Sequence, residues 1–362
     1  MAEHYQAMCR YIDYILEKNI DPKTGVIVQE HVYGNLGDWL GPEDNKNDKT
    51  LMWEAYFLYD LEIMSKVAAL LGKAEDVERY DALYAERLDF FRKTYVDGVT
   101  AKTISSGMNG PQKGESVDIQ TSYVLPLSFG LIADTMKVRF AANLANSVAR
   151  SNIADDGKRC PPYSLMTGFI GTAWINKALS DNGYDDVAYK LLQQTEYPSW
   201  LYPVEQGATT IWERLNSYTH VDGFGKNNRM NSFNHYSFGA VGAWLYGYSL
   251  GIMRDEDVPG FKHFILAPRV DPTGKMVSAK GYYDSLYGRI ESSWSISDDK
   301  VSYSFVIPAN TSATLRLHAE SLSRVKEGGL PVDVVEGISF IRCEDGVVEL
   351  EIGSGKYEFV VY

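Results

Sequence analysis

The sequence has little cysteine, a deficit of positive charge and no long apolar run. Its three cysteines, Cys9, Cys160 and Cys343, are odd in number and far apart, which argues against a disulfide framework and a clustered zinc site. Lysine and arginine total 35 against 48 acidic residues, and this net charge of -13 argues against nucleic acid or an anionic membrane as a partner. No apolar stretch approaches the roughly 20 residues of a membrane-spanning helix.

The first fifteen residues lack the basic and then apolar pattern of an export signal. Nothing in this sequence marks the chain for export. The expected location is therefore the cytoplasm, or no location is predicted. No spacing of histidine, cysteine and acidic residues indicates a metal site, and we expect neither a metal nor a cofactor.

Aromatic residues are what the chain has in abundance. They make up 13% of the sequence, with 25 Tyr, 14 Phe and 7 Trp, while the 45% hydrophobic content is ordinary for a globular protein. Sugars present apolar C–H faces that stack on aromatic rings. The composition therefore favours a carbohydrate-active protein.

The hydrophobic pattern changes about two thirds of the way along the chain. At roughly 150 residues per domain, a chain of 362 residues predicts two domains. We place them at 1–255, with helical periodicity, and 256–362, with short alternating strands. The predicted helices are 4–18, 50–71, 76–95, 119–132, 137–149, 171–179, 185–195 and 238–250. The predicted strands are 261–267, 277–283, 286–295, 301–308, 313–319 and two within 346–362. This is an α+β multidomain protein, with helical hairpins followed by an antiparallel β-sandwich.

Candidate site residues gather in loops between the predicted helices. They are Asp38, Trp39, Trp200, Trp212, Glu213, Asn234 and His235. Rings that stack on a sugar, polar groups that bind its hydroxyls and a carboxylate that activates water form a typical carbohydrate site. A structural interpretation is also open, with the two tryptophans in the core and Glu213–Arg214 as a local ion pair.

Two segments resemble a known family. PSWLYPVEQGATTIWERLNS at 198–217 and MNSFNHYSFGAVGAWLY at 230–246 resemble the catalytic domain of bacterial α-L-rhamnosidases, glycoside hydrolase family 78. GDWL at 37–40, the 120–131 helix and TGFIGT at 167–172 support the match. The strand-rich tail is similar to that family's C-terminal β-sandwich.

The resemblance implies an (α/α)6 barrel fold. It also implies an enzyme that hydrolyses terminal α-L-rhamnose from rhamnose-containing glycosides with inversion at the anomeric carbon. In that mechanism an acid and a base lie roughly 6.5–9.5 Å apart. By motif, Glu213 is the general base, and His235, Asp38 and Trp39 are sugar contacts. Trp212 flanks the base, and Asn234 and Trp200 are further sugar-contact candidates for which packing or loop capping is an equal alternative.

The sequence departs from the family at the general acid. The family's acid lies in a stretch resembling Asp-Glu-Arg-x-Gly-Trp-Thr-Gly-Asp, which these 362 residues do not contain. About eight helices are predicted where six hairpins need twelve, so we expect a barrel that is incomplete on its N-terminal side. An open ring exposes apolar faces, which favours self-association or an N-terminal partner chain that completes the barrel. Asp38, Asp118 and Glu205 are alternative acids. Asp118 competes with a role as helix cap, and Glu205 with a role in a salt bridge.

Two other functions stay open at this point. The chain is a relative of another helical-hairpin hydrolase, such as a trehalase or glucoamylase, or it is a non-catalytic sugar-binding fragment or half of a split enzyme. The pairing of TTIWER with SFNHY favours the rhamnosidase over the first of these, and the absent acidic motif is the argument for the second.

Overall fold

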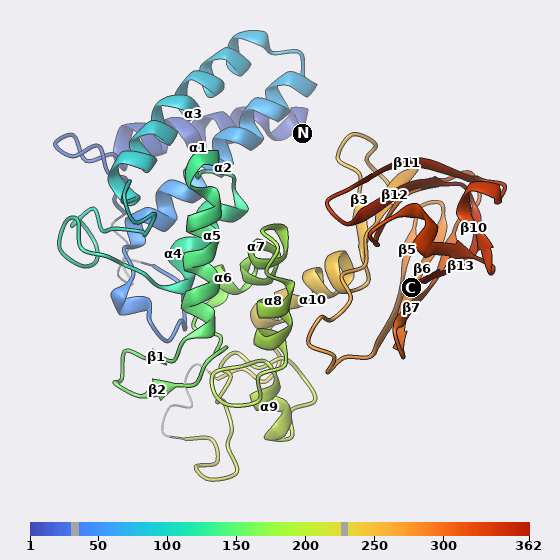
Figure 1. Ribbon diagram of the computed structural model, residues 1–362. Helices are drawn as coiled ribbons and strands as arrows, with labels where there is room; N and C mark the ends of the chain where they lie inside the picture. Colours follow the sequence, from blue (N-terminus) through green and yellow to red (C-terminus); the bar gives the residue numbers. More distant parts are fainter. Residues whose placement is uncertain (30–35, 226–230) are drawn as a thin grey trace. The chain divides into compact units, whose positions relative to one another are not determined.

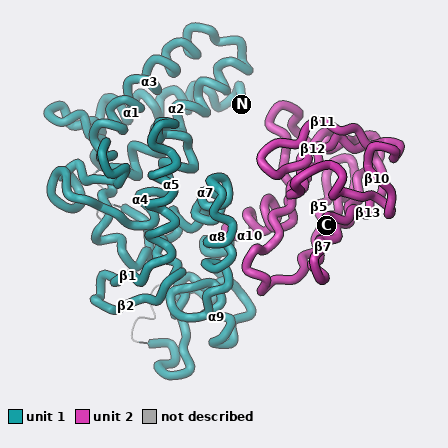
Figure 2. The backbone as a smooth tube through the Cα atoms, in the orientation of Figure 1, with its two compact units in different colours: residues 1–239 teal, residues 240–362 magenta. Residues whose placement is uncertain are grey.

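The chain forms two compact units, residues 1–239 and 240–362 (Figure 2). The computed structural model describes residues 1–29, 36–225 and 231–362. Met230 of the second family motif therefore lies outside the described residues. No helix in the described part of the chain is long and apolar enough to cross a membrane.

The first unit is built from helices joined by loops (Figure 1). Each helix predicted before residue 195 is present, although the one at 171–179 is interrupted at Ala173 and Trp174, and α9 was not predicted. The elements are α1 (Tyr5–Lys18), α2 (Lys49–Leu70), α3 (Ala74–Tyr95), α4 (Gln120–Ser128), α5 (Asp134–Ala149), β1 (Asn152–Ile153), β2 (Arg159–Cys160), α6 (Phe169–Thr172), α7 (Ile175–Asp181), α8 (Asp185–Leu192) and α9 (Leu201–Glu205).

Local sequence sets both ends of α2. Asp48 precedes the helix, and its carboxylate accepts hydrogen bonds from the amide (3.0 Å) and hydroxyl (2.7 Å) of Thr50. At the other end Gly72 has a φ of +69°, and its amide and that of Lys73 donate to carbonyls of the last turn at 3.1 and 3.0 Å. A glycine takes this left-handed conformation at little cost, so the chain turns there and α3 packs back along α2.

A buried ion pair joins α2 to α3. The guanidinium of Arg87 donates to both carboxylate oxygens of Glu54, whose side chain is fully buried, and to the carbonyl of Gly25 at 3.0 Å. Burial raises the pKa of Glu54, and the bonds from Arg87 oppose that rise. The pair therefore fixes the hairpin and the 19–28 turn that packs beside it.

The second unit begins with an irregular helical segment and continues as a β-sandwich. The segment comprises a 3-10 turn (Ser237–Ala240) that begins in the first unit, α10 (Val241–Trp244) and a π-helical turn (Leu245–Ser249), where the sequence predicts one long helix. Its end is held to strand β6 (Gly288–Ser297), because Trp294 Nε1 donates to the Ser249 carbonyl and Ser292 Oγ to the Leu250 carbonyl, at 2.8 and 2.6 Å. Our division at residue 255 rests on the change of sequence pattern and stays a prediction.

The sandwich has two sheets that share one core. The strands are β3 (Ile252–Arg254), β4 (His263–Leu266), β5 (Ser278–Ser285), β6 (Gly288–Ser297), β7 (Lys300–Ile307), β8 (Ser312–His318), β9 (Val325–Glu327), β10 (Leu330–Pro331), β11 (Ile338–Glu344), β12 (Val347–Ile352) and β13 (Gly355–Val361). The six-stranded sheet has the order β10-β9-β13-β7-β6-β5, and the five-stranded sheet β11-β12-β8-β4-β3. Pairing is antiparallel except between β4 and β8, which are parallel. Alternate residues such as Phe305 and Phe359 from one sheet and Leu315 and Leu350 from the other form a single buried cluster.

We predict that Glu54→Gln destabilises the chain by about 3 kcal/mol, because it leaves the Arg87 charge buried without a partner. Urea unfolding followed by far-UV circular dichroism measures the change. Asp89→Asn, which removes an exposed pair with Lys93 on the same α3 helix, is the matched control and should cost less than about 0.5 kcal/mol. Equal effects of the two substitutions would show that the buried pair does not fix the hairpin.

Candidate active site

The Asp38 carboxylate holds three distant segments of the first unit together. Only 1% of the residue is exposed. Its two oxygens accept four hydrogen bonds, from the Thr121 hydroxyl and from the amides of Gly168 (2.7 Å), Ile170 (2.8 Å) and Gly171 (3.0 Å). Burial raises the pKa of Asp38 to about 6, while the Thr121, Gly171 and Gly168 donors lower it. Because both carboxylate oxygens already accept hydrogen bonds, the geometry favours a structural role for Asp38. A direct sugar contact by Asp38 stays a prediction.

The segment that Asp38 binds lies directly on the Asp38–Trp39 turn. A Cβ added at Gly168 would lie 2.2 Å from the Asp38 carbonyl oxygen and 2.3 Å from that of Trp39, so only glycine fits. The Phe169 amide donates to the Trp39 carbonyl at 3.0 Å. The Trp39 side chain is 43% exposed, as an aromatic platform for a ligand must be.

The two family motifs form a short backbone ladder. The Glu213 amide donates to the Ser232 carbonyl at 2.8 Å, and the His235 amide to the Ile211 carbonyl at 2.9 Å. The Ser232 amide in turn donates to Oε2 of Glu213 at 2.8 Å. The predicted base is thus held by the same segment that carries His235, and its side chain is mostly buried, with 8% of the residue exposed.

His235 connects this ladder to the Asp38 segment. Its ring stacks on Phe169, with centroids 4.8 Å apart and 24° between the planes, and on the exposed Tyr236 at 5.4 Å and 7°. The Ser237 amide donates to Nδ1 at 3.4 Å. This bond places the proton of a neutral imidazole on Nε2, where it can be donated to a hydroxyl.

The remaining predicted sugar contacts lie less favourably. Trp200 is 9% exposed and donates from Nε1 to the Phe238 carbonyl at 2.9 Å. Trp212 is 7% exposed and packs edge-on against Phe233. Both positions fit the core interpretation better than stacking on a ligand. Asn234 is exposed and precedes His235 in the chain, and its contact with a sugar stays a prediction.

Neither Asp38 nor Asp118, two of the three alternative acids, combines a raised pKa with exposure to a ligand. Burial raises the pKa of Asp118, but hydrogen bonds from Lys102, Tyr123 and Arg150 outweigh it and the pKa is lowered. That network replaces the helix-capping role expected from sequence, since no side chain caps α4. Glu205 is exposed at the end of α9, and Asp38 is buried.

Two residues of the candidate site were not predicted from the sequence to have a role. Phe169 and Thr121 belong to segments quoted as family matches, but only the fold shows that one stacks on His235 and the other binds Asp38. Within residues 1–29, 36–225 and 231–362, no three histidine, cysteine or acidic side chains lie together as metal ligands would.

Helical hairpins with a carboxylate and aromatic loop site, followed by a β-sandwich, define the class of six-hairpin glycosidases. Residues 1–248 match the bacterial alpha-L-rhamnosidase 6 hairpin glycosidase domain, and residues 251–329 match the C-terminal domain of the same enzymes. The chain belongs to the bacterial α-L-rhamnosidase family.

Individual relatives agree. The chain is 33% identical over 325 residues to an alpha-L-rhamnosidase of Streptomyces avermitilis, covering 90% of this chain and 28% of the relative. An alpha-L-rhamnosidase of Formosa agariphila is 31% identical, with coverage of 90% and 33%. The crystal structure of the Streptomyces avermitilis enzyme complexed with L-rhamnose superposes with a TM-score of 0.81 at 30% identity, covering 100% of this chain and 31% of that one. The structure from Dictyoglumus thermophilum gives 0.79 at 27% identity, with coverage of 99% and 37%. The chain thus spans about a third of the length of these relatives.

We predict that Asp38→Asn destabilises the first unit by about 2 kcal/mol, because the amide nitrogen would face two N–H or O–H donors that now bind an oxygen. Urea unfolding at pH 8, where the native carboxylate is ionised, measures the loss. Asp186→Asn, which removes a half-exposed pair with Lys190, is the control and should change stability by less than about 0.5 kcal/mol. An unchanged unfolding free energy in Asp38→Asn would mean that the carboxylate does not hold these segments.

Proposed function

We propose that this chain acts in the inverting hydrolysis of terminal α-L-rhamnose from rhamnose-containing glycosides. The observation that carries the proposal is the Glu213 carboxylate, fixed by the Ser232 amide in a ladder that also holds His235. Family membership supports the substrate class, and a relative has been solved with L-rhamnose.

In this reaction Glu213 is the general base. It takes a proton from a water molecule while the water oxygen forms a bond to the anomeric carbon on the face opposite the leaving group. The glycosidic C–O bond breaks, and an acid gives its proton to the departing oxygen. Ser232 binds Oε2, and no donor among the described residues reaches Oε1, which leaves that oxygen to the water. We assign the proton donor to none of Asp38, Asp118 and Glu205.

Recognition of the sugar falls to the residues that are both accessible and held in place. Trp39 offers an exposed indole to the apolar face of the ring, and His235 offers an N–H at Nε2 to a hydroxyl. Asn234 adds a carboxamide at the rim. The trehalase or glucoamylase alternative has no observation in its favour, since both family matches are to rhamnosidases.

A partner surface accompanies this site. A groove of about 330 Å³ lies between α1 and α2 and is lined mainly by apolar side chains, among them Met8, Tyr11, Ile63 and Met64. Tyr11 and Tyr14 on α1 are 55% and 59% exposed. Apolar faces of this kind favour association, and we propose that a second copy of this chain covers the groove.

We predict that Glu213→Gln lowers the release of chromophore from an aryl α-L-rhamnoside by about 10²–10⁴-fold, the usual contribution of a general base. The amide keeps the Ser232 bond, so L-rhamnose binding, followed by tryptophan fluorescence, should persist. Glu205→Gln is the control and should retain the wild-type rate. Full activity in Glu213→Gln would remove this residue from the base role, and absence of both turnover and L-rhamnose binding in the wild type would reject the function.

We also predict that the purified chain is larger than a monomer in light scattering, and that Tyr11→Glu shifts it toward the monomer by placing a charge in the groove. Val138→Glu changes an apolar residue of α5 that is 79% exposed but does not line the groove, and it should leave the mass unchanged. A compact wild-type monomer at all concentrations would contradict self-association through this surface.

A further inference from the structure

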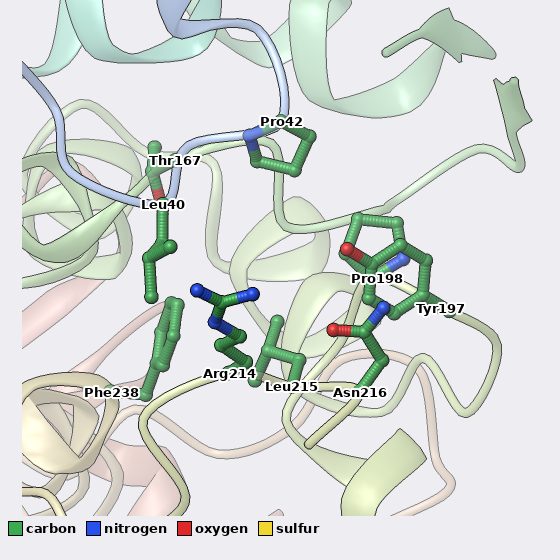
Figure 3. A pocket seen from close by; sticks show the side chains of 9 residues that line it. All are labelled: Leu40, Pro42, Thr167, Tyr197, Pro198, Arg214, Leu215, Asn216 and Phe238. Carbon is green, nitrogen blue, oxygen red and sulfur yellow. The ribbon is translucent and has the colours of Figure 1, made fainter. Parts of the chain in front are cut away.

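A second cavity opens beside the Glu213 ladder, and a guanidinium points into it (Figure 3). Its volume is about 210 Å³, and Arg214 is the one charged residue among those that line it. Tyr197, Phe238 and Leu40 supply apolar walls, while Asn216 and Thr167 supply polar groups. A cation in such a cavity, with no acidic neighbour in the lining, is an unusual arrangement that calls for an anion.

The Arg214 side chain has no partner in the described part of the chain. Its Nε is buried and donates to no acceptor there. The adjacent Glu213 does not compensate it, because Oε2 of that residue accepts the Ser232 amide and no ion pair joins the two side chains. Burial, together with the charges of Cys160 and Asp156, raises the pKa of Tyr197 to about 12, and the Arg214 guanidinium opposes that rise.

The cavity has the features of a site for one acidic sugar ring. A guanidinium presents two parallel N–H groups that match a carboxylate. The rings of Tyr197 and Phe238 can pack on C–H faces of a pyranose, and the exposed Asn216 carboxamide can reach its hydroxyls (Figure 3). The volume is below the roughly 300–1,000 Å³ of sites for drug-sized ligands, which suits a single ring.

The cavity adjoins the residues proposed to bind rhamnose. Leu40 follows Trp39 directly in the chain. Phe238 packs edge-on against Phe169 at 5.3 Å, and Phe169 is the ring that stacks on His235. The Phe238 ring that lines the cavity thus belongs to the same ring cluster as His235.

We propose that the Arg214 cavity binds a uronate, a sugar bearing a carboxylate, and that it selects glycosides in which the rhamnose is attached to an acidic saccharide. The selection of glycosides rests on the proposed function, whereas binding of the uronate itself does not. Arg214 supplies the ion pair, Tyr197 and Phe238 supply the stacking surface, and Asn216 supplies hydroxyl recognition.

Isothermal titration of the purified chain with D-glucuronate, D-glucose and acetate tests the cavity. We expect D-glucuronate to bind at least tenfold more tightly than either of the others, since each lacks one half of the recognised chemistry. Equal affinity for D-glucose would remove the role of the charge. Equal affinity for acetate would show a general anion site, and either result would overturn the proposal.

Substitutions locate the binding. Arg214→Gln should weaken D-glucuronate binding at least tenfold, and Asn216→Ala, an exposed position where folding is not at risk, should weaken it severalfold. Arg159→Gln is the matched control, because Arg159 is an exposed cation lining a neighbouring cavity that also includes Tyr197. Loss of binding in Arg159→Gln, or unchanged binding in both Arg214→Gln and Asn216→Ala, would overturn the assignment.

Titration with L-rhamnose keeps the two proposals separate. Arg214→Gln should leave L-rhamnose affinity within about twofold of the wild type if the cavities are distinct. D-Glucuronate binding without L-rhamnose binding would reject the proposed function and support the cavity. L-Rhamnose binding without D-glucuronate binding would do the reverse.

Discussion

The candidate site depends on one buried carboxylate. Asp38 binds Thr121, 83 residues away, and Gly168, Ile170 and Gly171, which are 130 to 133 residues away. These bonds offset the cost of burying an acidic group. They bring a loop, the start of α4 and the start of α6 to one place, and each of those segments carries a residue that the site uses. A loop-built site on helical hairpins needs such a fixed point, because loops have few contacts of their own.

Ring contacts and backbone hydrogen bonds connect the Asp38 segments to His235 and Glu213. The bound segment presents Phe169, which stacks on His235 and packs against Phe238, and His235 belongs to the loop segment whose backbone bonds to Ile211 and Glu213. Backbone bonds carry the last step, so the position of the Glu213 carboxylate depends on main-chain geometry and on the Ser232 amide. Preorganisation of this kind reduces the reorganisation that a reaction requires.

Sequence reasoning predicted the elements whose patterns are local and missed those set by tertiary contacts. The 3.6-residue periodicity of α1 predicted that helix, the glycine at 72 predicted the end of α2, and alternation predicted β6, β7 and β8. The segment 238–250 is continuously apolar, and no sequence signal showed that it changes from 3-10 to α to π geometry as its end is tied to β6. Motifs predicted Glu213 and His235, but the ladder between them and the role of Phe169 arise from pairing across the chain. Asp38 shows the limit most clearly, since its sequence context fits a sugar contact and a structural anchor equally well.

The adjacent Glu213 and Arg214 illustrate how the ladder separates two functions. An ion pair between these neighbours was open from the sequence, but both residues lie in a bend of the loop and their side chains have different surroundings. Glu213 binds the Ser232 amide, while Arg214 lines the 210 Å³ cavity. A carboxylate paired with a guanidinium is stabilised in its ionised form and is a poorer proton acceptor. Keeping the two apart leaves the carboxylate available to a water molecule and the guanidinium available to an anion, so one dipeptide provides both the proposed base and the proposed determinant of substrate charge.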